Sequence, residues 1–216
     1  MKPLLVTAVF SIMALGACGN DSESSPTARI LASVATDVIA GEGAPAPGLT
    51  RAMLANVVTP VQRVTREATG QQALVANVAV NQGVQTWSSV DKVTVSFRQG
   101  VLVATRGFGG DLMAADVPGA ATLFRGSTGH TRAHTLLDGT DQPIRTVYVC
   151  SVTKRDPQDV VIVGISYRTT HVVEACSNAG VSFQNEFWFD GAQGVRKSRQ
   201  WVGPDAGYLI SEDLRG

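Results

Sequence analysis

Alternating apolar and polar residues predict β-strands over most of the chain after residue 57. Val93, Val95 and Phe97 alternate with Thr94 and Ser96, which is the two-residue period of a half-buried strand. Valine and threonine, which favour strands, dominate this part of the chain. The pattern therefore favours extended structure over helix for the body of the protein.

Turn residues divide this region into hairpins. Gln99-Gly100 separates the alternating strand from the apolar run 101–104, so residues 92–106 are expected to form a hairpin. Asp138-Gly139 and Asp190-Gly191 are similar turn signals. The run 160–165 is apolar apart from one glycine, and we expect it to be a strand buried on both faces. The other strand-like runs are 131–137, 144–154, 181–189 and 195–202.

Helical periodicity is confined to short segments. Apolar residues recur at helical spacing over 28–40, a second short helix is expected at 50–56, and 110–125 has a weaker helical character. About ten or eleven strands in uninterrupted antiparallel order remain. This order predicts a mainly β protein, an antiparallel barrel-like or sandwich domain with one or two short N-terminal helices.

The first residues have the pattern of a secretory signal. Lys2 is followed by a short apolar stretch, Leu4 to Leu15, and the stretch ends in Leu15-Gly16-Ala17-Cys18. Small residues directly before a cysteine resemble the lipobox of bacterial lipoproteins. We therefore expect 1–17 to be a signal peptide and Cys18 to carry acyl chains such as palmitate. Two or more acyl chains give lasting membrane attachment.

The residues after Cys18 indicate where the chain is anchored. Lipoproteins kept in the inner membrane usually have Asp directly after the cysteine, whereas this chain has Gly19. We therefore expect a lipid-anchored, periplasm-facing protein of the outer membrane. Residues 18–27 are small, polar and acidic and predict a flexible tether. A single β-rich domain is expected over 28–216.

Charge and hydropathy limit the possible partners. Removing the signal peptide takes away one of 18 basic residues, against 18 acidic ones, so the net charge is about −1. Such a balance gives no reason to expect nucleic-acid binding. After the signal no apolar run is long enough to span a bilayer as a helix.

The two cysteines of the body predict a disulfide. Cys150 and Cys176 both lie in strand-like segments, and the periplasm is oxidising. The cross-link would contribute roughly 3–4 kcal/mol. A cysteine metal site would need further ligands at metal spacing. We therefore expect a disulfide and no metal.

The histidines do not predict a metal or catalytic site. On a strand His130 and His134 share a face but are roughly 13 Å apart, too far for one ion. His171 has no acidic or cysteine residue at motif spacing. All three are interpreted as surface or ordinary hydrogen-bonded histidines.

Other candidate motifs favour structural roles. Gly107–Asp111 is rich in glycine but lacks the lysine and hydroxyl residue of a phosphate loop, so we interpret it as a turn. Asp111 and Asp116 would be a carboxylate pair or a cap for the following turn, and capping is favoured. No Gly-x-Ser-x-Gly motif occurs. No cofactor and no catalytic residues are therefore expected.

Aromatic and basic residues are the remaining binding candidates. Trp87, Trp188 and Trp201 either fill a core or stack on sugar rings, and burial of all three would favour protein–protein scaffolding over glycan binding. The basic cluster Arg196, Lys197 and Arg199 is either a solvated strand face or a patch for an anionic polymer.

Four stretches of the chain together carry a resemblance to a known family. They are Trp87 to Asp91, Gly100 to Gly107 with Asp111-Leu112, Phe187 to Asp190, and Ser198 to Trp201. In this order they resemble the YjbF/GfcB family of outer-membrane lipoproteins, over about residues 30–210. The chain departs from the family at Phe108, often leucine, and at Phe187, often tyrosine. Loss of the tyrosine hydroxyl leaves any polar role at position 187 in doubt.

The resemblance implies an all-β, barrel-like domain without known catalytic activity. It also implies a place in the export of group 4 capsule and related exopolysaccharides, with a periplasmic partner and a large outer-membrane barrel as companions. We therefore expect a non-catalytic accessory factor that binds partner proteins or polysaccharide. Two alternatives are a carrier of lipid or lipopeptide, and a glycan-modifying enzyme with paired acids in a cleft.

Overall fold

The computed structural model describes residues 48–55, 57–191 and 194–215. These residues form one antiparallel sheet of twelve strands and two short helices, α2 (Arg51–Leu54) and α3 (Ala120–Arg125). The predicted signal peptide, Cys18, the tether and the helix 28–40 lie outside the described residues. The strands are β1 (Val61–Arg66), β2 (Gln72–Asn81), β3 (Val84–Ser88), β4 (Thr94–Arg98), β5 (Val101–Arg106), β6 (Ala114–Asp116), β7 (His130–Leu137), β8 (Pro143–Ile162), β9 (Ile165–Ser177), β10 (Ser182–Asp190), β11 (Gly194–Gly203) and β12 (Gly207–Asp213).

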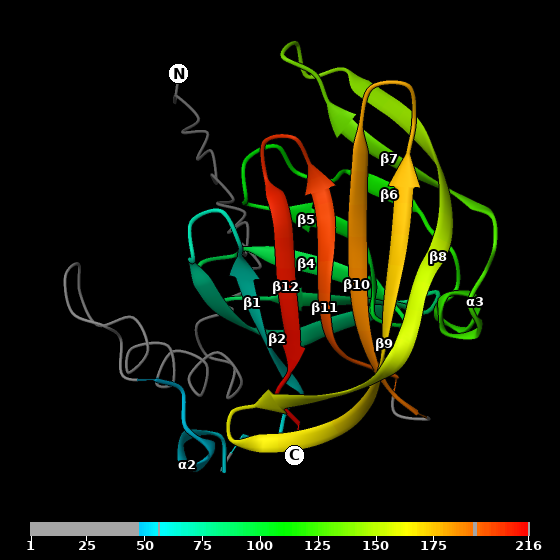
Figure 1. Cartoon of the computed structure of the whole chain (residues 1–216). Helices are drawn as coiled ribbons and strands as arrows, with labels where there is room; N and C mark the ends of the chain where they lie inside the picture. The colour runs from blue at the N-terminus through cyan, green and yellow to red at the C-terminus, as the bar shows by residue number, and fades with distance from the viewer. Residues whose placement is uncertain (1–47, 56, 192–193, 216) are drawn as a thin grey trace, which may run out of the picture.

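The sheet curls into a nearly closed barrel. Its strand order is β5-β4-β3-β2-β1-β12-β11-β10-β9-β8-β7-β6, so β5 and β6 are the two edges. The two edges are linked near Thr105 of β5, whose N–H donates to the carbonyl of Leu112, two residues before β6 begins, at 2.9 Å. Figure 1 shows β9 to β12 upright in front, with β4 and β5 crossing behind them. The predicted barrel-like β fold is confirmed, with twelve strands in place of ten or eleven.

The interior is packed by side chains from alternate positions of the strands. Trp87, Val95 and Leu102 come from three neighbouring strands and are almost completely buried. They pack against Val202 and Leu209 from the opposite wall. Each fully buried side chain of this kind contributes roughly 1.5–3 kcal/mol, so this cluster holds the two walls together.

The β8–β9 hairpin extends beyond the barrel and curls beneath it toward α2 (Figure 1). Near its tip, Ile162 and Tyr167 pack with Leu54 of α2. The prediction of one doubly buried strand over 160–165 is wrong, because Val163 and Gly164 have φ values of 46° and 77° and form a turn. These left-handed angles fit a two-residue hairpin loop. The part of the β8–β9 hairpin around Ile162 and Tyr167, called the arm below, covers one outer face of the barrel.

The predicted disulfide is present. Cys150 on β8 and Cys176 on β9 lie directly opposite each other and are joined through their sulfur atoms. Both residues are buried. The bond therefore fixes the register of these two strands where they enter the barrel wall.

The helical predictions were accurate only in part. Within the described residues, the helix expected at 50–56 is the four-residue α2, and residue 56 lies outside the described part of the chain. In 110–125, residues Ala114–Asp116 form strand β6 and only Ala120–Arg125 form a helix. Leu123 of α3 is fully buried against Val101 and Phe187, so this short helix is held by packing.

Candidate functional site

One end of the barrel contains a cavity of about 480 Å³. This is within the size range of small-molecule sites. The lining comes from both walls and from α3, so the closed sheet and the helix create it together. The lining residues are Gln62, Gln85, Trp87, Phe97, Gln99, Gly100, Ala120, Ala121, Phe124, Phe189, Gly191, Gly194, Val195, Asp213 and Arg215.

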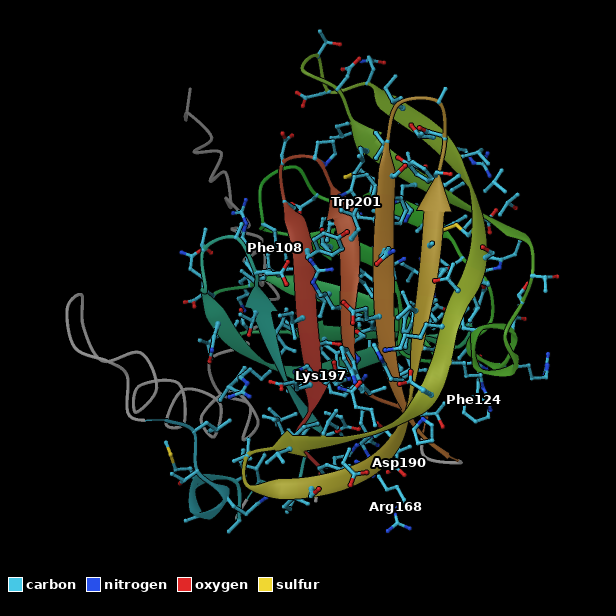
Figure 2. The ribbon with its side chains drawn as sticks, in the orientation of Figure 1. Phe108, Phe124, Arg168, Asp190, Lys197 and Trp201 are labelled. Carbon is cyan, nitrogen blue, oxygen red and sulfur yellow. A yellow bond between two sulfur atoms is a disulfide. The ribbon has the colours of Figure 1, made fainter. Side chains whose placement is uncertain are left out.

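Aromatic rings form a large part of the wall. Phe97 and Trp87 come from neighbouring strands β4 and β3. Phe124 of α3 packs edge-on against Phe189 of β10, with ring centroids 5.4 Å apart. In Figure 2 Phe124 lies in the lower part of the molecule, whereas Trp201 lies toward the upper end. The cavity therefore has apolar walls suited to a ring-shaped ligand.

The charged residues of the cavity neutralise each other. Arg215 donates from Nε to Oδ1 of Asp213 at 2.9 Å, and this hydrogen bond raises the pKa of Arg215. Nη1 of Arg196 lies 3.8 Å from Oδ2 of Asp213. Among the described lining residues, Asp213 is the only acid. The other polar side-chain groups of the described lining are the amides of Gln62, Gln85 and Gln99 and the indole N–H of Trp87.

Three buried polar atoms without a partner in the described part of the chain lie at this end of the barrel. Nε1 of Trp87 and Oε1 of Gln62 are buried, and no hydrogen-bond partner is found for them within the described residues. Asn77, directly opposite Trp87 in register, has a third such atom, Nδ2. Because an unsatisfied buried polar group costs about 1–3 kcal/mol, these atoms indicate where a bound molecule would be stabilised.

None of the three tryptophans forms an exposed platform. Trp87, Trp188 and Trp201 are 2%, 8% and 8% exposed. Trp188 is covered by the arm, where its Nε1 donates to Oε1 of Gln158 and its ring stacks on His171. Trp201 stacks on Phe183 within a separate aromatic cluster. Burial of all three favours protein–protein scaffolding over the stacking of sugars on an exposed tryptophan, and only Trp87 of the three lines the cavity.

The basic cluster does not form an unpaired patch. Arg196 donates to Asp190 at 2.8 Å and Arg199 donates to Glu67 at 2.6 Å. Lys197 lies 3.7 Å from Glu212, and its ammonium group lies over the ring of Trp188. Figure 2 shows Lys197 on the front strands above Asp190. Their pairing with carboxylates reduces the positive field that an anionic polymer would need.

A buried polar network occupies the wall formed by β7, β9 and β10. Glu174 is completely buried and accepts hydrogen bonds from Arg132 at 2.9 Å and Asn185 at 2.7 Å, and its Oε1 lies 2.7 Å from Nε2 of His130. Burial alone would raise the pKa of Glu174, but Arg132 and the hydrogen bonds outweigh it and the pKa falls to about 2. Glu174 is therefore a structural group that is charged at neutral pH.

The same network is a poor metal centre. Possible ligand atoms of His130, Cys150 and Glu174 lie within 4.8 Å of one another. The sulfur of Cys150 is bonded to Cys176, and a metal ligand must be a free thiolate. Two protein ligands remain at this place, fewer than a structural or catalytic zinc site uses.

The other histidines are buried or paired. His134 packs among Tyr148, Phe183 and Trp201 and is 1% exposed. The interpretation of His134 as a surface or ordinary hydrogen-bonded residue missed this apolar setting. Burial, reinforced by Arg132, lowers the pKa of His134 to about 4. Nε2 of His171 lies 2.9 Å from Glu186, a partner supplied by the neighbouring strand β10.

Asp111 and Asp116 are not a carboxylate pair. Asp111 accepts hydrogen bonds from the backbone of Gly107 and Phe108 and from the hydroxyl of Thr105. It therefore stabilises the turn that precedes it, not the following turn. Asp116 is largely exposed and lies 3.5 Å from Arg145. Phe187, where the family often has tyrosine, is completely buried beside Val172.

Among the described residues, no helix is both long and apolar enough to cross a bilayer. The fold is that of a small antiparallel barrel, and the cavity at one end is lined by both aromatic and polar side chains.

Comparison with known proteins then identifies the family. The family described as "Group 4 capsule polysaccharide lipoprotein gfcB, YjbF" matches residues 32–214, and the chain belongs to this family. Among solved structures, the barrel is similar to the hypothetical lipoprotein YmcC from Escherichia coli K12, with a TM-score of 0.70 at 16% identity. The match covers 90% of this chain and 98% of that chain. No curated protein matches.

Proposed function

We propose that this protein is a lipid-anchored accessory factor in the secretion of a capsule or related exopolysaccharide, and that it acts by binding and not by catalysis. The single observation that carries the proposal is the family match over 32–214, to a group described as capsule polysaccharide lipoproteins. The barrel supports it, because a rigid closed sheet is a suitable frame for a binding site.

The proposed anchor is the acylated Cys18, with Gly19 favouring the outer membrane. Acyl chains on this cysteine would keep the barrel at the periplasmic face of the membrane. Two kinds of binding surface support an accessory role. The cavity is one, and the exposed valines Val147 and Val149 on one face of β8 are the other. Apolar residues that share an exposed face favour contact with another protein.

The composition of the cavity argues against the two alternative functions. Hydrolysis of a glycan normally needs two carboxyl groups about 5 Å or 6.5–9.5 Å apart, whereas the described lining has one carboxylate, held by Arg215. An acyl chain would leave Trp87 Nε1 and Gln62 Oε1 without partners. A binding role for a polar ligand or a protein is therefore preferred.

Deleting the gene tests this function. The deletion strain should have less polysaccharide at its surface while intracellular polysaccharide persists, because export and not synthesis is impaired. A plasmid copy of the gene should restore the surface polysaccharide. Unchanged surface polysaccharide in the deletion strain would refute the proposal.

A further inference from the structure

The unpartnered atoms at the cavity form a complementary pair. Nε1 of Trp87 is a hydrogen-bond donor and Oε1 of Gln62 is an acceptor. Trp87 lies on β3 and Gln62 on β1, and the single strand β2 separates them. A hydroxyl group both donates and accepts, so a ligand with several hydroxyls satisfies both atoms.

The aromatic walls favour a ligand that is also a ring. Phe97, Phe124 and Phe189 line the cavity and offer apolar surfaces. The rings of Phe124 on α3 and Phe189 on β10 contact each other. A sugar ring has apolar C–H faces and polar hydroxyls around its rim, which matches apolar walls combined with amides. An alkyl chain would match the phenylalanines alone.

The absence of net charge among the described lining residues of the cavity favours neutral sugars over anionic ones. The Asp213 carboxylate is 3% exposed and is paired with Arg215, so the pair adds no net charge to the site. The remaining polar groups of the described lining are neutral glutamine amides and the indole of Trp87. A uronate or phosphate would find only the Arg215 guanidinium, which Asp213 already neutralises, and would therefore lose its hydration with little compensation.

We propose that this end of the barrel binds a neutral sugar residue, whose hydroxyls accept from Trp87 Nε1 and donate to Gln62 Oε1. The inference rests on the proposed function and gives it a site and a ligand class. The competing explanation is that ordered water alone fills the cavity and satisfies these atoms.

Fluorine NMR of the full chain labelled with 5-fluorotryptophan tests this proposal. The three tryptophans give three signals, and Trp87→Phe assigns the one from Trp87. The chain is kept in a phosphocholine detergent, because a maltoside would add sugar. The probes are methyl glucoside, methyl galactoside, methyl glucuronide and hexanoate.

A saturable shift of the Trp87 signal with at least one neutral glycoside is expected, with the Trp201 signal unmoved. The glucuronide should bind at least about tenfold more weakly. Gln62→Leu should weaken the neutral glycoside about tenfold, because one buried hydrogen bond is lost. Gln184→Leu, the same change at an exposed position of β10, is the matched control and should have no effect.

Other results would overturn the inference. These are a Trp87 signal that no neutral glycoside moves, a signal that responds to hexanoate alone or equally to the glucuronide, and a Gln62→Leu chain that binds as the unmodified chain does. Such a failure is distinguishable from failure of the proposed function. A deletion strain that loses surface polysaccharide would still support the accessory role, with the barrel acting through a protein partner.

Discussion

Oε2 of Glu174 lies 2.9 Å from Nη2 of Arg132, and both side chains are almost completely buried. Arg132 is on β7 and Glu174 is on β9, with β8 between them. The ion pair therefore spans three strands close to the disulfide. A buried ion pair adds little to the net stability of a fold, but removing one partner is strongly destabilising because the other charge stays buried without compensation.

Loss of Arg132 should destabilise the barrel strongly. Arg132→Met leaves the Glu174 carboxylate buried without its cation, and we expect the free energy of unfolding to fall by roughly 3–5 kcal/mol. Urea unfolding followed by circular dichroism measures this. Arg145→Met removes an exposed arginine paired with Asp116 and should cost less than about 1 kcal/mol. Equal effects of the two substitutions would contradict the assignment.

Stability should decline in acid in two separate pH ranges. The pKa of His134 is lowered from 6.5 to about 4 in the folded chain. Between these two pH values His134 is therefore protonated in the unfolded chain but neutral in the folded chain. This contribution is complete above pH 6.5 and is lost as the pH falls toward 4, on the order of 3 kcal/mol. The pKa of Glu174 is lowered from 4.5 to about 2, so its contribution is lost below pH 4.5.

His134→Phe separates the two ranges. Phenylalanine keeps a ring among Tyr148, Phe183 and Trp201 but does not titrate. The variant should show little change of stability between pH 6.5 and pH 4.5 and the normal decline below it. Urea unfolding at a series of pH values measures this, and an unchanged slope in the upper range would show that another group is responsible.

Gly100 should not tolerate a side chain. It has φ = +84°, and a Cβ atom there would lie 2.6 Å from Cβ of Val195 on β11. Gly70 has a similar φ of +70° with nothing near its Cβ position, so Gly70→Ala is a matched control. The left-handed angle should cost each variant about 1–2 kcal/mol, and Gly100→Ala should lose about 1–3 kcal/mol more through the clash. Equal thermal stability of both variants would argue against this contact between the β4–β5 turn and β11.

Removal of the disulfide should lower stability by about 3–4 kcal/mol. Cys150→Ala combined with Cys176→Ala leaves two buried alanines and frees the unfolded chain of its cross-link. Urea unfolding with and without a reducing agent measures the effect. The reducing agent should destabilise the unmodified chain and leave the double variant unchanged, and a response of the double variant would contradict this.

The sequence predicted those features that depend on neighbouring residues. Gln99-Gly100 and Asp138-Gly139 each mark a turn between alternating strands, and the hairpins are there. Val163 misled the prediction, because a β-branched residue rarely adopts φ = 46°. The following Gly164 was the available signal for a turn. Local patterns thus predicted the strands but not each reversal of the chain.

The cavity could not be predicted, because its residues meet only when the barrel closes. Gln62, Trp87 and Phe124 lie far apart in the sequence and come from β1, β3 and α3. The charged network could not be predicted for the same reason, since Glu174 is 42 residues from Arg132 in the sequence. One signal was present: Glu174 interrupts the otherwise apolar run Val172 to Cys176, and a charge in such a run indicates a buried partner.

Surface polysaccharide in a deletion strain is the most direct test of the central claim. The strain should be complemented with the unmodified gene or with a Cys18→Ala gene, and surface and intracellular polysaccharide should be quantified in each. The account predicts that deletion lowers surface polysaccharide, that the unmodified gene restores it, and that the unanchored variant fails to do so. Surface polysaccharide that is the same with and without the gene would contradict the account.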